Sequence, residues 1–118
     1  MRFFILIAAL CVFFDSGVSA AAGDYPTRPV KVVSPYAPGG GLDVVGRSLL
    51  KRVGEALQQQ FIIENRPGAG TTIGSAYVAR SAPDGYTLLL TLRALSISPS
   101  IYKNMTFDPE KDLEPITR

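Results

Sequence analysis

The chain has 118 residues, which allows one small domain at most. Its 12 basic and 10 acidic residues give a net charge of +2, and they are scattered along the sequence without alternating with aromatic residues, which argues against a nucleic-acid partner. There is no histidine, and the single cysteine is Cys11, so the sequence offers no Ser-His-Asp triad and no zinc site built from these residues. These absences remove the usual general base and the usual zinc ligand.

Residues 1–20 have the pattern of a secretory signal peptide. A basic start at Arg2 is followed by the apolar run 3–14, and small residues precede a cut after Ala20. A single membrane anchor is the alternative, but the apolar run is too short to span a bilayer comfortably. We expect export to the periplasm, with residues 21–118 as the mature chain.

The first predicted unit is a strand, a glycine-rich loop and a helix. Residues 31–34 continue a β-branched run that two prolines stop, and three consecutive glycines follow in the loop. The spacing of apolar residues then predicts a helix over 42–58. The apolar residues that define this helix face are Leu42, Val45, Leu49, Val53 and Leu57.

The loop that contains Gly39, Gly40 and Gly41 is a candidate anion site. The helix that follows has unpaired N–H groups and the positive end of its dipole at this point. Glycines allow a carboxylate or phosphate to approach these groups without meeting a Cβ. An ordinary strand-to-helix turn, with Asp43 only stabilising the dipole, is the alternative interpretation. No Lys-Ser or Lys-Thr pair follows, so a nucleotide P-loop is not supported.

A second unit of the same kind follows. Residues 61–64 predict a short buried strand, 65–70 a second loop, and 71–80 a helix capped by Thr71 or Thr72. Its apolar side is expected at Ile73, Ala76, Tyr77 and Ala79. Two such helix starts at one sheet edge would point N–H groups into one crevice, where ligands bind in open α/β sheets. The glycines of this loop resemble a dinucleotide fingerprint only weakly, because no acidic residue follows a further strand.

A turn at 82–85 leads into residues 86–92, which predict the strongest strand of the chain. Beyond Arg93 the sequence is rich in serine and proline, and we expect irregular structure with a further turn at 107–109. The sequence thus predicts an α/β fold with a mostly parallel sheet and flanking helices.

Several motifs occur in a distinctive order and spacing. They are YPTRPV (25–30), PGGGLD (38–43), ENRPGAG (64–70), APDGYTL (82–88), PSIY (99–102) and FDP (107–109). Together they resemble the Bug family, the periplasmic substrate-binding proteins of tripartite tricarboxylate transporters. The resemblance runs from Tyr25 to the end of the chain.

The resemblance implies a two-lobed binding protein that captures a small carboxylate and delivers it to the membrane components of the transporter. It implies no catalysis, no cofactor and no metal, because the family holds its ligand largely through backbone N–H groups and waters of the first two strand-to-helix loops. Asp43 would orient a ligand hydroxyl or ammonium, or fix the loop. The implied ligand-binding residues are Tyr36, Gly39, Gly40, Gly41 and Asp43 in the first loop, and Ala69, Gly70, Thr71 and Thr72 in the second.

The sequence also departs from the family pattern. Thr71 stands where the family usually has a glycine, and Arg93 either contacts a second carboxylate or is a surface residue. Family members are much longer, so residues 21–118 are expected to be part of the first lobe, with the second lobe absent. The alternative functions are a non-functional gene remnant and an exported enzyme domain that binds phosphate or a nucleotide.

Overall fold

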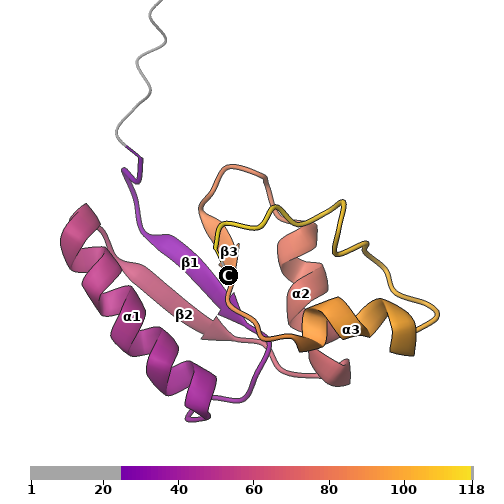
Figure 1. The fold of residues 1–118 in the computed structure, drawn as a ribbon. Coiled ribbons are helices and arrows are strands. Elements are labelled where there is room, and N and C mark those ends of the chain that lie inside the picture. The colour runs from indigo at the N-terminus through magenta and orange to yellow at the C-terminus, as the bar shows by residue number, and fades with distance from the viewer. Residues whose placement is uncertain (1–24, 118) are drawn as a thin grey trace, which may run out of the picture.

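A computed structural model of the chain describes residues 25–117, and the signal-peptide interpretation lies outside them. These residues form a three-stranded sheet in the order β2-β1-β3 (Figure 1). Both neighbours run parallel to the central strand, with Val32 opposite Ile63 on one side and Leu88 on the other. The strands are β1 (Val30–Ser34), β2 (Phe61–Asn65) and β3 (Thr87–Leu89).

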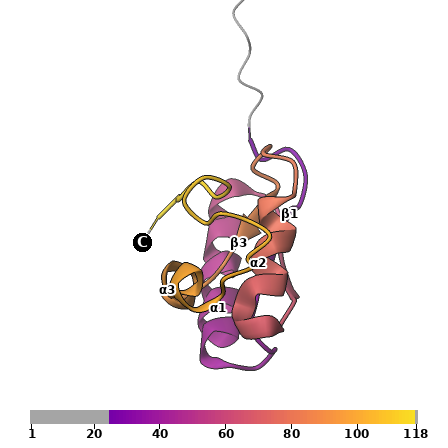
Figure 2. The same ribbon diagram turned by 90° about the vertical axis from the view of Figure 1, so that its right-hand side faces the viewer.

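The helices lie on both faces of this sheet. Figure 1 shows α1 on one side and α2, with α3 beside it, on the other, and Figure 2 looks from the side of α2 and α3, with α1 behind them. The helical elements are α1 (Gly41–Leu57), the short 3-10 helix η1 (Ala69–Thr71), α2 (Thr72–Ala79) and α3 (Ala94–Ile101). The predicted α/β fold with a parallel sheet is therefore confirmed. Within residues 25–117, no helix combines the length and apolar character needed to cross a membrane.

The central strand β1 supplies half of the buried hydrophobic residues among those described. Val30 and Val33 are fully buried and Val32 is 3% exposed. Successive side chains of a strand point to opposite faces, so Val30 and Val32 lie under α1 while Val33 lies under α2. A central parallel strand covered on both faces is expected to be largely apolar, and β1 fits this with three valines, while Lys31 and Ser34 are its polar members.

The face that α1 presents to the sheet differs from the predicted one. Val45 is 64% exposed and Leu49 is 53% exposed, whereas Asp43 and Gly46 are buried. A Cβ on Gly46 would collide with the side chain of Leu90, so the helix approaches the sheet at this glycine. Close approach through a residue without a side chain rotates the helix away from the stripe that its apolar spacing indicates.

The correction to α2 is partial, because Ala76 is buried as expected. Ile73, expected on the apolar side, is 55% exposed, and the helix buries Gly74 and Ser75. A Cβ on Gly74 would lie 2.7 Å from the carbonyl oxygen of Arg66 and 2.9 Å from Cβ of Pro35. Small residues thus allow α2 to pack directly on the backbone of both loops.

The predictions for the last third of the chain were wrong in two respects. The strand expected over 86–92 is only β3, three residues long. The segment after Arg93, expected to be irregular, forms α3 with Pro99 inside it. Pro99 lies near the end of this short helix, and Ser98 bonds through its hydroxyl to the carbonyl of Ala94 at 2.7 Å, so the serine and proline content that suggested a loop is accommodated by the helix.

Candidate functional site

Both glycine-rich loops lie at the carboxyl edge of the sheet, because β1 and β2 are parallel and each is followed by a helix on its own face (Figure 1). The backbone N–H of Arg66 donates to the carbonyl of Ser34 at 2.8 Å, which ties the start of the second loop to the end of β1. Gly74 of α2 packs against Pro35 of the first loop. The bases of the two loops are therefore in contact at this edge of the sheet.

The first loop is open at its glycines. Gly40 occupies the N-cap position of α1 and no side chain caps the helix, so the first N–H groups remain exposed in the loop. No atom lies within 4 Å of where a Cβ would stand on Gly39 or Gly41, and only the carbonyl of Ala37, at 3.5 Å, lies near that of Gly40. Gly39 has a φ of +80°, which favours glycine there. This stretch can admit an anion close to the backbone.

Asp43 has its carboxylate turned into the protein. The residue is 4% exposed, and its carboxylate accepts hydrogen bonds from the Gly39 N–H at 3.0 Å and from Nδ2 of Asn65 at 3.0 Å. Arg47 donates to it through Nε at 2.9 Å and through Nη2 at 3.1 Å. The hydrogen bond from Arg47, followed by those from Gly39 and Asn65, holds the pKa of Asp43 well below its ordinary value. These four hydrogen bonds occupy the carboxylate in holding the loop.

The second loop has an unusual backbone. Ala69, Gly70 and Thr71 have φ values of 45°, 59° and 80°, all in the left-handed region. Non-glycine residues seldom adopt this conformation and it costs free energy, which makes the loop a strained segment of the kind found at binding sites. The hydroxyl of Tyr102 lies against Gly70, where a Cβ would collide with it.

The expected threonine cap of α2 is absent. Thr71 stands at the N-cap position, but its side chain makes no capping hydrogen bond. Thr72 instead donates from its hydroxyl to the carbonyl of Ala69 at 2.8 Å. Like α1, α2 therefore begins without a side-chain cap.

Four buried hydroxyl groups have no hydrogen-bond partner among the described residues, and two of them belong to the predicted site. A buried polar group without a partner costs about 1–3 kcal/mol, so a polar ligand or water that reaches it is favoured. Tyr36 comes from the first loop and Thr71 from the second. The groups are Ser34 Oγ, Tyr36 OH, Thr71 Oγ1 and Ser75 Oγ.

The structure places the predicted site residues in two groups. Gly39, Gly40, Gly41, Ala69 and Gly70 are exposed, whereas Asp43 and Thr71 are buried and Tyr36 and Thr72 are intermediate. Prediction from sequence missed Arg47 and Asn65, which hold Asp43 in place. The spacing of four residues between Asp43 and Arg47 was a signal for the first. Asn65 bonds to residues 22 and 29 positions away, for which one sequence carries no signal.

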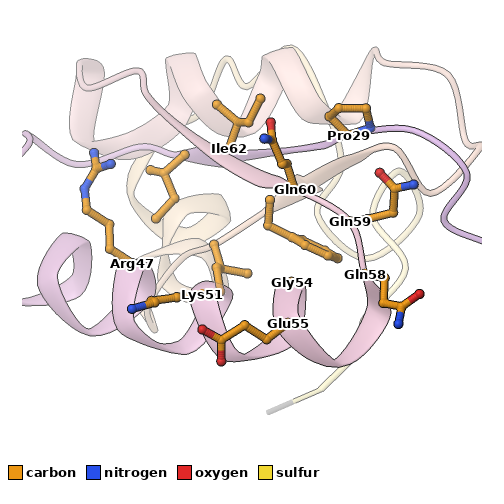
Figure 3. A pocket seen from close by; sticks show the side chains of 12 residues that line it. Pro29, Arg47, Lys51, Gly54, Glu55, Gln58, Gln59, Gln60 and Ile62 are labelled. Atoms are coloured by element: carbon orange, nitrogen blue, oxygen red, sulfur yellow. The ribbon is translucent and has the colours of Figure 1, made fainter.

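A separate hollow of about 920 Å³ lies along the outer edge of β2, beneath α1 (Figure 3). It extends from Arg47 to the C-terminal end of α1, where Gly54 and Gln58 line it. Both helix starts lie at the other end of the sheet (Figure 1). The hollow follows an unpaired strand edge, and we do not assign the anion site to it. Across residues 25–117 there is also no cluster of acidic side chains that would bind a metal ion.

A parallel sheet whose helices begin on opposite faces at one carboxyl edge is an arrangement in which open α/β sheets bind ligands. The family model described as "Tripartite tricarboxylate transporter family receptor" matches residues 45–118. The chain belongs to this receptor family, which is a family of transport proteins and not of enzymes. Protein BugT of Bordetella pertussis is 36% identical to it over 117 residues, which are 95% of this chain and 36% of BugT.

Solved structures support the same assignment. The periplasmic binding protein BugD is 47% identical and superposes with a TM-score of 0.75 over 78% of this chain and 31% of BugD. MatC from Rhodopseudomonas palustris, solved with bound malate, is 36% identical, with a TM-score of 0.73 over 78% of this chain and 32% of MatC. The chain thus spans about one third of the length of these relatives.

Proposed function

We propose that this chain forms part of the first lobe of an exported solute-binding receptor, and that its two loops hold a carboxylate group of a small di- or tricarboxylate or similar acidic metabolite. The observation that carries the proposal is the pairing of two uncapped helix starts at one sheet edge. Helix starts attract anions through their free N–H groups and their dipoles. Malate bound to MatC, a relative of similar fold, supports the same class of ligand.

The residues have distinct roles in this proposal. The backbone of Gly40 and Gly41 offers N–H groups with space above them for a ligand oxygen, and Gly39, whose own N–H is bonded to Asp43, leaves the approach open by having no side chain. Ala69 and Gly70 present the exposed backbone of the second loop. The hydroxyls of Tyr36, Thr71 and Thr72 add polar contacts, of which the first two are buried and have no partner in the described part of the chain. Asp43 positions the first loop.

The location and the partners of the protein follow from the family. BugD is a periplasmic binding protein, which supports a periplasmic location for this chain. The family is named for tripartite transporters, so the membrane components of such a transporter are the proposed partners. A receptor of this kind binds and releases its ligand unchanged.

Calorimetric titration of the chain with malate and with phosphate tests this proposal. We expect malate to bind, and Gly40→Val to weaken binding at least tenfold, because the added side chain enters the space that the ligand carboxylate occupies. Gly40 has φ −71° and ψ 166°, a conformation open to valine, so the variant should keep its fold. Unchanged affinity in a folded Gly40→Val variant would contradict the loop assignment. Tighter binding of phosphate than of malate would favour the phosphate-binding alternative, and no binding at all would favour the gene remnant.

A further inference from the structure

The side chain of Asn65 joins the two loops at their bases. Asn65 is the last residue of β2, and its Nδ2 donates to the carbonyl of Tyr36 at 3.1 Å and to Oδ1 of Asp43 at 3.0 Å. Arg47 donates from Nη2 to Oδ1 of Asn65 at 3.3 Å. One amide group therefore contacts the first loop, the first turn of α1 and the next turn.

The geometry points to Asn65 as a positioning residue that couples the second loop to the first through Asp43. Arg47 is the cation that neutralises the Asp43 carboxylate, so that this carboxylate does not repel an anionic ligand. This inference rests on the proposed carboxylate site. It assigns a function to two residues that act through the Asp43 carboxylate.

The coupling runs through a defined chain of bonds. Asn65 and Arg47 fix the orientation of the Asp43 carboxylate, and Oδ2 of that carboxylate accepts the N–H of Gly39. Gly39 precedes the uncapped start of α1, so its position determines where the exposed N–H groups of the loop point. Asn65 makes no direct hydrogen bond to Gly39 among the described residues, so an effect of Asn65 on Gly39 passes through Asp43 or through the loop backbone that Asn65 holds at Tyr36.

Charge gives Arg47 its role. A buried carboxylate one turn from an anion site would repel the ligand, because like charges interact strongly where water is excluded. Arg47 forms a two-pronged ion pair with Asp43 and cancels this charge. Asn65, which is neutral, completes the hydrogen bonding of the carboxylate without adding charge.

Amide hydrogen exchange in the whole chain tests the coupling without requiring a ligand. We expect Asn65→Ala to raise the exchange rate of the Gly39 amide by about tenfold or more, the effect of losing a hydrogen bond to a charged group. The amide of Val32 in the core, measured in the same sample, reports global unfolding, and Asn104→Ala at an exposed asparagine is the matched control. Gly39 exchange that changes no more than that of Val32 would overturn the coupling, because a role of Asn65 confined to its own strand leaves Gly39 untouched.

Malate titration of the Arg47 variants tests the second part. We expect Arg47→Gln to weaken malate binding by about tenfold or more, with a stronger dependence on salt. Arg47→Lys should retain part of the affinity, because lysine keeps the positive charge but cannot form the two-pronged ion pair. Equal affinity for the wild type and Arg47→Gln would overturn the role of Arg47. If the wild type binds no malate, the proposed function fails and the role of Arg47 in anion binding fails with it, while the exchange of Gly39 still decides the coupling by Asn65.

Discussion

The backbone N–H of Gly39 donates a hydrogen bond to Oδ2 of Asp43, 3.0 Å away, so that the carboxylate in the first turn of α1 also holds the loop before it. In the same side chain, Oδ1 faces Asn65 at the end of β2. The buried Asp43 thus connects the first loop, through Gly39, to the end of the neighbouring strand β2, through Asn65.

This arrangement predicts a pH dependence of stability. The folded pKa of Asp43 is lowered, chiefly by Arg47, below an ordinary value of about 4. Its contribution to stability is therefore present above the ordinary value and is lost as the pH falls toward the folded pKa. We expect the gap in free energy of unfolding between the wild type and Asp43→Asn to be constant near neutral pH and to shrink below about pH 4. Urea unfolding at several pH values measures it, with Glu55→Gln on the same helix as the control, and a gap that is equally large at low pH would contradict the prediction.

Gly74 and Gly46 provide a matched pair for helix packing. Gly74→Ala places a Cβ against the backbone carbonyl of Arg66, at 2.7 Å, and against Pro35, neither of which can yield without moving a loop. We expect a loss of about 1–3 kcal/mol, although alanine is the better helix former. Gly46→Ala meets only the tip of the Leu90 side chain, which can rotate, so its stability should stay near that of the wild type. Denaturant unfolding compares the two, and equal effects would show that α2 does not rest on the loop backbone.

Val45 tests which face of α1 is packed, and Val33 of β1, which lies under α2, is the reference for a buried valine. Val45 is 64% exposed and Val33 is fully buried. Val45→Ala should change the free energy of unfolding by no more than about 0.5 kcal/mol, as is usual for surface positions. Val33→Ala should cost about 2 kcal/mol from lost burial. If Val45→Ala proves as costly as Val33→Ala, the face indicated by the apolar spacing is the packed one after all.

Thr71 tests the strained second loop. Its φ of 80° is unfavourable for a residue with a branched side chain, and its buried hydroxyl has no partner within residues 25–117. Thr71→Gly removes both costs, so we expect it to raise the free energy of unfolding by about 1 kcal/mol or more. The same variant should bind malate more weakly if the hydroxyl contacts the ligand. A less stable Thr71→Gly variant would contradict the strain.

The sequence sufficed for the layered parallel fold because its signals there are local. Prolines and glycines mark the ends of β1 and β2, and the spacing of apolar residues marks α1. The packed faces of the helices were not predictable in this way. The helices approach their neighbours at Gly46 and Gly74, which have no side chain, whereas apolar periodicity is read from side chains alone. The helix α3 was missed because serine and Pro99 indicate a loop, whereas packing of α3 on η1 and α2 favours the helix.

The candidate site divides in the same manner. Glycines before a helix indicate exposed N–H groups from sequence alone, and the motifs around them indicate the family. The hydrogen bonds of Asn65 to Asp43 and Tyr36 depend on the register in which β2 pairs with β1, which a single sequence does not specify. A residue that positions a loop from a neighbouring strand therefore becomes visible only in the structure.

The most direct test of the central claim is to record amide chemical shifts of the ¹⁵N-labelled chain during a titration with malate. The account predicts that the largest shifts occur at residues 39–43 and 69–72, the two helix starts, with Gly54 and Gln59 beside the separate hollow unchanged. Shifts concentrated at Gly54 and Gln59, or no shifts in either loop, would contradict the claim that these loops form a carboxylate site.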